Sequence, residues 1–320
     1  MDLDIEQLDC TGCTALTSIP VLPNLKELYC SNCTALTSIP VLPKLKTLFC
    51  QCCTTLTSIS ALPKLELINC YECKSLTSFP ECPALRELNC AYCTALVTVP
   101  PFPILEKLSC TGCTALTSIP ILPKLILLGC QNCTALTSIP VMEELKYLFC
   151  THCMSVTDLP VIPKLVHLFC QYCTSFTRIP PITNLELLYC EGCTALTSIP
   201  LLLKLTELNC RNCTGLTVIP VLPKLKKLNC EYCTSLTEVF ESPTLKELHC
   251  NGCKWIVQCS DYDGNIKSLR TCQAIVKRKL IGRKLEKLIP VVTEIYYSPG
   301  CKWESIARQS FSNLLHSSFE

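Results

Sequence analysis

Pairs of cysteines spaced C-x-x-C are the residues of this sequence whose type and spacing could do chemistry. Thirteen such pairs occur, from Cys10/Cys13 to Cys250/Cys253, and they contain most of the 31 cysteines. Two neighbouring pairs could supply the four thiolates of a structural zinc site, and a single pair can form a disulfide. The chemistry to be decided is therefore metal binding, disulfide formation or the burial of unreactive thiols.

The regular spacing of the pairs favours buried thiols. Successive pairs lie 20 residues apart without insertion or deletion, whatever residues surround them. Cysteine is small, is readily buried and has a weak S–H donor, which suits equivalent positions in a core. We expect structural thiols, no metal and no cofactor, with metal at some pairs and disulfides as the alternatives.

Five further cysteines lie outside the pairs. None of them stands beside a histidine with an orienting partner in the sequence, so we expect no catalytic nucleophile and no catalytic residue. They are Cys52, Cys82, Cys259, Cys272 and Cys301.

A 20-residue repeat must position the paired cysteines. Alternation around residues 28–31 predicts a short strand, with Leu28 and Cys30 facing inward and Tyr29 facing outward. Stacked units should therefore form a parallel sheet. Pro40 and Pro43 exclude a helix from the short return path and favour an extended, polyproline-like back.

The repeat matches the leucine-rich repeat template, with cysteine also in the place of the third leucine. One unit reads Leu25-x-x-Leu28-x-Cys30-x-x-Cys33-x-x-Leu36, followed by Thr37-Ser-Ile39-Pro40-Val-Leu42-Pro43-Lys. The turn after Leu36 resembles the LxxLPxLP turn of bacterial effectors with 20-residue repeats. The cysteine-rich version is most similar to leucine-rich repeat proteins of mimivirus-like giant viruses, as is the segment KLEKLIPVVTEIYYSPGCK at 284–302.

The pattern and the resemblance together predict the domain organisation. We expect residues 1–253 to form a leucine-rich repeat solenoid of about 13 units, with the parallel sheet on its concave face. Apolar residues near helical spacing, and the need to cover the end of the solenoid, predict a small α-helical cap over 254–320. The basic stretch 272–288 is faintly similar to a calmodulin-binding helix, but a solvated helical face is the preferred interpretation.

Composition excludes some classes of partner. The chain is 49% hydrophobic and 17% charged with a net charge of +2, which gives no electrostatic reason to expect nucleic acid. No stretch has the length and apolar character of a membrane span, and the opening residues do not resemble a secretion signal. We therefore expect a cytoplasmic location, which the resemblance specifies as the host cytoplasm, and reduced thiols.

The outward strand positions vary between units and predict a binding site. Aromatic and apolar residues gather from the seventh to the tenth unit, next to polar residues, as at many protein-binding surfaces. The candidate residues on the concave face are Leu127, Tyr147, Phe149, His167, Phe169, Tyr172, Leu187, Tyr189, Asn209 and Arg211. The alternative is that these rings only stack on each other and cover the sheet. The opposite surface, rich in Thr, Ser and Pro, is expected to be a solvated back.

These observations predict a non-enzymatic scaffold that binds a protein partner. The resemblance to viral proteins implies that this partner is a host factor. A ubiquitin-ligase-related effector or adaptor is one alternative, although the 67 residues after the repeats are fewer than the ligase domains of bacterial effectors occupy. A metal-binding protein built on the cysteine pairs is the other.

Overall fold

The computed structural model describes residues 4–239 and 244–253, and every structural statement below concerns these residues. They contain no helix. The expected helical cap at 254–320 and the calmodulin-like stretch 272–288 lie outside the described residues.

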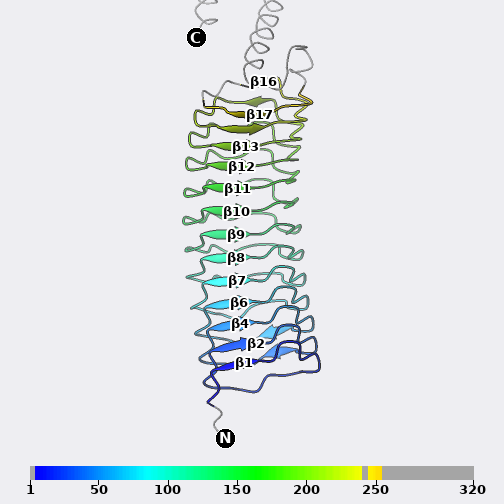
Figure 1. Ribbon diagram of the computed structural model, residues 1–320, viewed down its shortest axis with the longest axis vertical. Coiled ribbons are helices and arrows are strands. Elements are labelled where there is room, and N and C mark those ends of the chain that lie inside the picture. The colour runs from blue at the N-terminus through cyan, green and yellow to red at the C-terminus, as the bar shows by residue number, and fades with distance from the viewer. Residues whose placement is uncertain (1–3, 240–243, 254–320) are drawn as a thin grey trace, which may run out of the picture. The chain divides into compact units, whose positions relative to one another are not determined.

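One 13-stranded parallel sheet runs through the described residues (Figure 1). Each strand pairs in register with the strand 20 residues further along, as Leu148 does with Leu168. The strands are β1 Gln7–Asp9, β2 Glu27–Tyr29, β4 Thr47–Phe49, β6 Leu67–Asn69, β7 Glu87–Asn89, β8 Lys107–Ser109, β9 Leu127–Gly129, β10 Tyr147–Phe149, β11 His167–Phe169, β12 Leu187–Tyr189, β13 Glu207–Asn209, β15 Lys227–Asn229 and β17 Glu247–His249. The predicted parallel sheet is confirmed.

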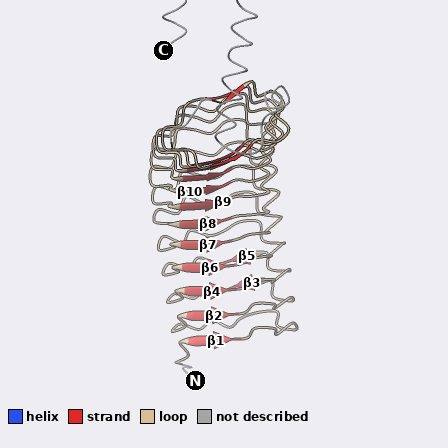
Figure 2. Ribbon diagram, turned by 45° about the horizontal axis from the view of Figure 1, so that its top comes forward, coloured by secondary structure: helices blue, strands red, loops and turns tan. Residues whose placement is uncertain are grey.

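The return path is extended, with only short pieces of regular structure. Two small parallel ladders pair β3 (Ser38–Ile39) with β5 (Ser58–Ile59), and β14 (Val218–Ile219) with β16 (Glu238–Val239). Figure 2 shows β3 and β5 on a different side of the coil from β2, β4 and β6. The prolines explain the extended path, because they fix φ and remove a backbone donor from each turn.

The core is built from seven inward positions in each unit. In the second unit these are Leu22, Leu25, Leu28, Cys30, Cys33, Leu36 and Ile39, and none is more than 6% exposed. Because a parallel register places identical positions on top of each other, each inward position becomes a column of similar side chains along the coil. The period of the sequence therefore determines the core directly.

A left-handed residue precedes the second cysteine of every unit. The φ angle is positive at this position in all thirteen units, from Gly12 to Gly252. The turn also extends the ladder between units, since the Asn32 N–H donates to the Gln51 carbonyl oxygen at 2.8 Å. Glycine, Asn, Tyr and other residues all occupy the position, so its left-handed conformation is imposed by the turn and by these hydrogen bonds.

The back is exposed to solvent, as its Thr, Ser and Pro content predicts, but it is not uniformly polar. The residue just before the buried Leu22 position of each unit is exposed and usually aliphatic, as at Val21, Ile121 and Leu201, which are 58–67% exposed. The residue that follows each of them, Leu22, Leu122 or Leu202, is buried. An apolar surface thus lies where the sequence suggests a polar one.

Candidate functional site

The outward side chains of the 13-stranded sheet form one continuous surface, which we call the sheet face. The first and third residues of each strand contribute to it, and so does the second residue after the strand. Because the strands pair in register, each of these positions forms a row that runs from unit to unit. Nine of the ten candidate binding residues lie in these rows, and Tyr172 does not.

Aromatic side chains occupy one row of the sheet face continuously from β10 to β12. The ring centroids of Phe149 and Phe169 lie 4.8 Å apart, and those of Phe169 and Tyr189 lie 5.0 Å apart, with nearly parallel planes. Before Phe149 the same row contains only Ser109 and Gly129 in the two preceding strands. The stack of three rings is therefore separated by small and polar residues from the other stacked pair of this row, Tyr29 and Phe49.

A second row runs beside this stack and is also apolar. It contains Leu127, Tyr147, His167 and Leu187 in register. His167 lies edge-on to Tyr147, with 5.1 Å between the ring centroids, and edge-on to Phe169 at 6.4 Å. The members of both rows are half-buried. We call these seven residues, Leu127, Tyr147, Phe149, His167, Phe169, Leu187 and Tyr189, the aromatic patch.

Carboxylates border the aromatic patch toward the end of the sheet. The Tyr189 hydroxyl donates a hydrogen bond to Glu207. Burial and this hydrogen bond raise the pKa of Tyr189 to about 12. The phenol therefore stays protonated at neutral pH and holds Glu207 in place at the edge of the patch.

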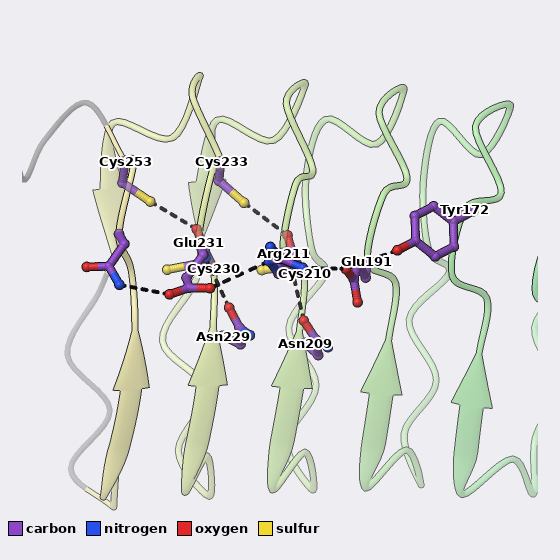
Figure 3. A network of polar contacts seen from close by, with 11 residues as sticks. Tyr172, Glu191, Asn209, Cys210, Arg211, Asn229, Cys230, Glu231, Cys233 and Cys253 are labelled. Atoms are coloured by element: carbon purple, nitrogen blue, oxygen red, sulfur yellow. Dashed lines mark hydrogen bonds and ion pairs between the residues drawn. The ribbon is translucent and has the colours of Figure 1, made fainter.

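Arg211 lies in a network of polar contacts beside the patch (Figure 3). Its guanidinium nitrogens are 3.2 Å from a Glu191 oxygen and 3.5 Å from a Glu231 oxygen. The guanidinium carbon also lies 5.3 Å from the centroid of the Tyr232 ring. Arg211, expected as a polar contact for a partner, is thus already held by two carboxylates and a ring.

Asn209 is likewise engaged within the chain. Its side-chain oxygen accepts a hydrogen bond from the Arg211 backbone N–H at 3.1 Å, and Asn229 does the same for Glu231. Asn69 and Asn89 repeat the contact in earlier units. Asparagine in this row therefore stabilises the turn that follows the strand.

Tyr172 does not belong to the strand rows in which the sequence suggested it. It occupies the left-handed position of the turn, with φ of 58°. Its ring stacks on His152 at 4.8 Å, and its hydroxyl donates to Glu191 at 3.1 Å. The structure therefore brings together seven of the ten candidate residues as the aromatic patch. Asn209 continues the row of Tyr189 at the end of β13, and Tyr172 and Arg211 lie in the turns that follow the strands.

The cysteines form two buried columns behind the sheet face. The second thiol of a pair donates to the carbonyl oxygen of the first cysteine in the preceding unit, as Cys153 does to Cys130 at 3.0 Å. Figure 3 shows the same contact from Cys233 to Cys210 and from Cys253 to Cys230. No disulfide joins the cysteines between Cys10 and Cys233. The pairs thus fill the core and form a weak S–H···O hydrogen bond that repeats from unit to unit.

A neighbouring thiol and burial keep the first thiol of the pairs from Cys30 to Cys230 protonated. The neighbouring Cys173 thiol and burial together raise the pKa of Cys150 well above its ordinary value. The pKa of Cys170 and of Cys190, the equivalent residues of the next two units, is raised in the same way. At the open first unit, burial raises the pKa of Cys10 to about 12. Because the thiolate is the nucleophile and the metal ligand, these thiols are poorly suited to either role at neutral pH.

Neither a metal cluster nor a membrane span is found in the described part of the chain. Among residues 4–239 and 244–253, no group of three or more His, Cys, Asp and Glu side chains is arranged to hold a metal ion. Within the same residues the structure contains no helix with the length and hydropathy needed to cross a membrane.

The architecture defines the class of protein. A parallel coil with a sheet on one side, leucine columns inside and an Asn/Cys position after each strand is the leucine-rich repeat fold. Residues 23–64 match the family model described as leucine rich repeats in two copies. No curated protein sequence matches the chain. Leucine-rich repeat proteins generally act as scaffolds for protein interactions.

One solved structure shows the same fold, and two others have lower similarity. The chain is similar to a leucine-rich repeat protein from Bacteroides ovatus ATCC 8483, with a TM-score of 0.54, 19% identity and coverage of 76% of this chain and 78% of that one. YopM from Yersinia enterocolitica WA-314 gives a TM-score of 0.40 at 17% identity, covering 79% of this chain and 70% of its own. The functional domain of InlJ from Listeria monocytogenes, which includes a cysteine ladder, gives 0.28 at 17% identity, covering 79% and 64%.

Two features of the surface were not found by reading the sequence. Glu191, Glu207 and Glu231 contact the candidate residues, and their positions in register with Arg211 and Tyr189 were a usable signal. The exposed aliphatic residue just before the buried Leu22 position also recurs every 20 residues. It was overlooked because the conserved-looking Thr-Ser-x-Pro frame around it is polar.

Proposed function

We propose that this protein is a non-enzymatic scaffold that binds a protein partner through the aromatic patch of the sheet face. The observation that carries the proposal is the in-register stack of Phe149, Phe169 and Tyr189 beside a second apolar row. Large aromatic side chains supply most of the binding energy in protein interfaces, especially when they are rigid and bordered by polar groups. Stacking holds these rings rigid, and Glu207 and the Arg211 network border them.

The charge at the border of the patch suggests the chemistry of the partner. Glu191 and Glu231 flank the Arg211 guanidinium there, and a third carboxylate, Glu207, accepts the hydrogen bond from Tyr189. A partner that combines an apolar anchor with nearby basic side chains fits this border best, because complementary charge favours the correct encounter.

The location and origin are proposals of the same kind. Buried, unoxidised thiols are typical of a reducing compartment, which supports a cytoplasmic protein. The repeat motif supports an origin in a giant virus, and the partner is then a protein of the host cytoplasm.

The test compares two stacks of rings on the same sheet face. The full chain is immobilised, and proteins captured from host-cell extract are quantified by mass spectrometry. Phe149→Ala with Tyr189→Ala should reduce capture of the specific partner about tenfold or more, as loss of two anchors does. The matched control is Tyr29→Ala with Phe49→Ala, which removes the stacked pair of β2 and β4.

The control pair makes the result interpretable. Tyr29 and Phe49 stack in the same row, with 5.3 Å between their ring centroids. Their removal therefore eliminates a stacking contact similar to those of the Phe149/Tyr189 variant and leaves the aromatic patch unchanged. Circular dichroism should show both double variants folded. Equal capture by wild type and the Phe149/Tyr189 variant would exclude the patch as the binding site.

A further inference from the structure

An exposed aliphatic stripe runs along the back of the described coil. It is formed by the residue that comes just before the buried Leu22 position of each unit. Its members are Val21, Val41, Ala61, Glu81, Pro101, Ile121, Val141, Val161, Pro181, Leu201 and Val221, all exposed. Glu81 is the single charged member of these eleven. With neighbouring strands about 4.8 Å apart, the stripe is about 50 Å long.

The exposure of the stripe is large. Its seven Val, Ile and Leu side chains are 45–67% exposed. The residue two positions later in each unit is also exposed or half-exposed and is mostly proline. Together these side chains offer roughly the 800 Å² per partner that a stable interface buries. Monomeric soluble proteins rarely expose a continuous apolar area of this size.

We propose that the aliphatic stripe is a homodimer interface, covered by the stripe of a second copy of this chain. The rise per unit gives every copy the same spacing, so two stripes can match over all eleven units, whereas a globular partner of ordinary size would cover only part of this length. The stripe has no aromatic or arginine anchor of the kind that heteromeric interfaces use. Homodimer interfaces, by contrast, are typically more apolar.

The flanking residues determine how the two copies lie. On one side the stripe is followed by a row with six exposed lysines, Lys44, Lys64, Lys124, Lys164, Lys204 and Lys224. On the other side it is preceded by a row that is mostly Ser, with Asp158 and Arg178 paired to each other.

A parallel pair avoids repulsion between these lysines. A two-fold axis along the stripe places the lysine row of each copy opposite the Ser row of the other. A two-fold axis across the stripe, with the coils antiparallel, places lysine opposite lysine, which is unfavourable. The dimer is therefore parallel, and it leaves the sheet face free because the two surfaces share no residue.

Self-association of the full chain tests the proposal. Sedimentation velocity and light scattering over the micromolar range should show a particle of twice the 35.6 kDa chain mass. Ile121→Asp with Val161→Asp should give a monomer, with the dissociation constant raised at least tenfold, because each change buries a charge in the interface. Thr114→Asp with Thr134→Asp adds the same charges at exposed positions outside the stripe and should remain dimeric.

A photo-crosslinker tests the orientation. With benzoylphenylalanine in place of Val21, the crosslinked peptide of the second copy should map near residue 21; mapping near residue 221 would overturn the parallel arrangement. A monomeric wild type, or a stripe variant that stays dimeric, would overturn the interface itself. Because no residue of the aromatic patch is changed, either result leaves the proposed partner binding intact.

Discussion

At the scale of the residue, the two cysteines of a pair are chemically different although the sequence repeats them equally. The thiol of Cys153 donates to the Cys130 carbonyl oxygen at 3.0 Å. The thiol of Cys150, which is fully buried, is in contact with the Cys173 thiol and has a raised pKa. A hydroxyl group at position 153 could therefore donate to the Cys130 carbonyl oxygen, whereas a hydroxyl group at position 150 would mainly contact the Cys173 sulfur.

This difference predicts unequal effects of serine. Cys153→Ser should change the free energy of unfolding by less than about 1 kcal/mol, because the hydroxyl can donate to the same carbonyl. Cys150→Ser should destabilise the protein by about 1–3 kcal/mol more, since it buries a hydroxyl with a poor partner. Urea denaturation followed by circular dichroism measures both values. Equal costs, or a larger cost at Cys153, would contradict the assigned hydrogen bonds.

At the scale of the element, the turn after each strand couples neighbouring units. The position is left-handed throughout, and at Gly192 an added Cβ would lie 2.5 Å from Cδ1 of Tyr172. Gly112 and Gly252 show the same close approach to Tyr92 and Tyr232. Tyrosine in one unit followed by glycine in the next is thus a packing motif of the turn.

The motif predicts a non-additive pair of substitutions. Gly192→Ala should cost about 1–2 kcal/mol of left-handed strain, and displacement of the Tyr172 ring should add to it. In the Tyr172→Ala background the same change should cost only the strain. Gly12→Ala is the matched control, because its φ is also positive and no atom lies within 4 Å of the added Cβ. Thermal unfolding of the single and double variants gives the coupling; additive effects would exclude the contact.

At the scale of the whole molecule, the repeated thiols predict a dependence of stability on alkaline pH. The pKa of the first thiols, as at Cys50, Cys110 and Cys190, is raised above the ordinary value of 9.0. A raised pKa in the folded state means that the unfolded state releases the proton first. The stability from these thiols is therefore complete below about pH 9 and is lost as the pH rises further.

The measurement is urea unfolding under reducing conditions. The free energy of unfolding should fall above about pH 9, because the first thiols of many units lose their protons more readily in the unfolded state. The hydrogen bonds from Cys30, Cys90 and Cys150 lower the pKa of Cys53, Cys113 and Cys173, which opposes part of this loss. Tyr189, with its pKa raised to about 12, should add a loss between about pH 10 and pH 12. Cys150→Ala with Cys170→Ala should make the dependence shallower. A free energy of unfolding that instead rises between about pH 7 and pH 9 would indicate thiolates in the folded state and would favour the metal-binding alternative.

The sequence by itself determined the repeat, the parallel sheet and the core. These follow from the 20-residue period, because a parallel register stacks identical positions and each position keeps its inward or outward direction. For the same reason the eight candidate residues that lie in strands share one surface, and binding at this surface stays a prediction. Leu148, Cys150 and Phe149 lie on the sides of the sheet that simple alternation predicts.

Only the tertiary structure decided what the outward residues contact. Tyr172 lies in the turn because a left-handed residue interrupts alternation after each strand, and Asn209 and Arg211 are held by groups from the turn and from adjacent units. The exposure of Val21 and Ile121 depends on how the proline segments bend, which hydropathy does not report. Period and alternation determine direction locally, whereas partners and exposure depend on backbone turns and on residues 20 positions away.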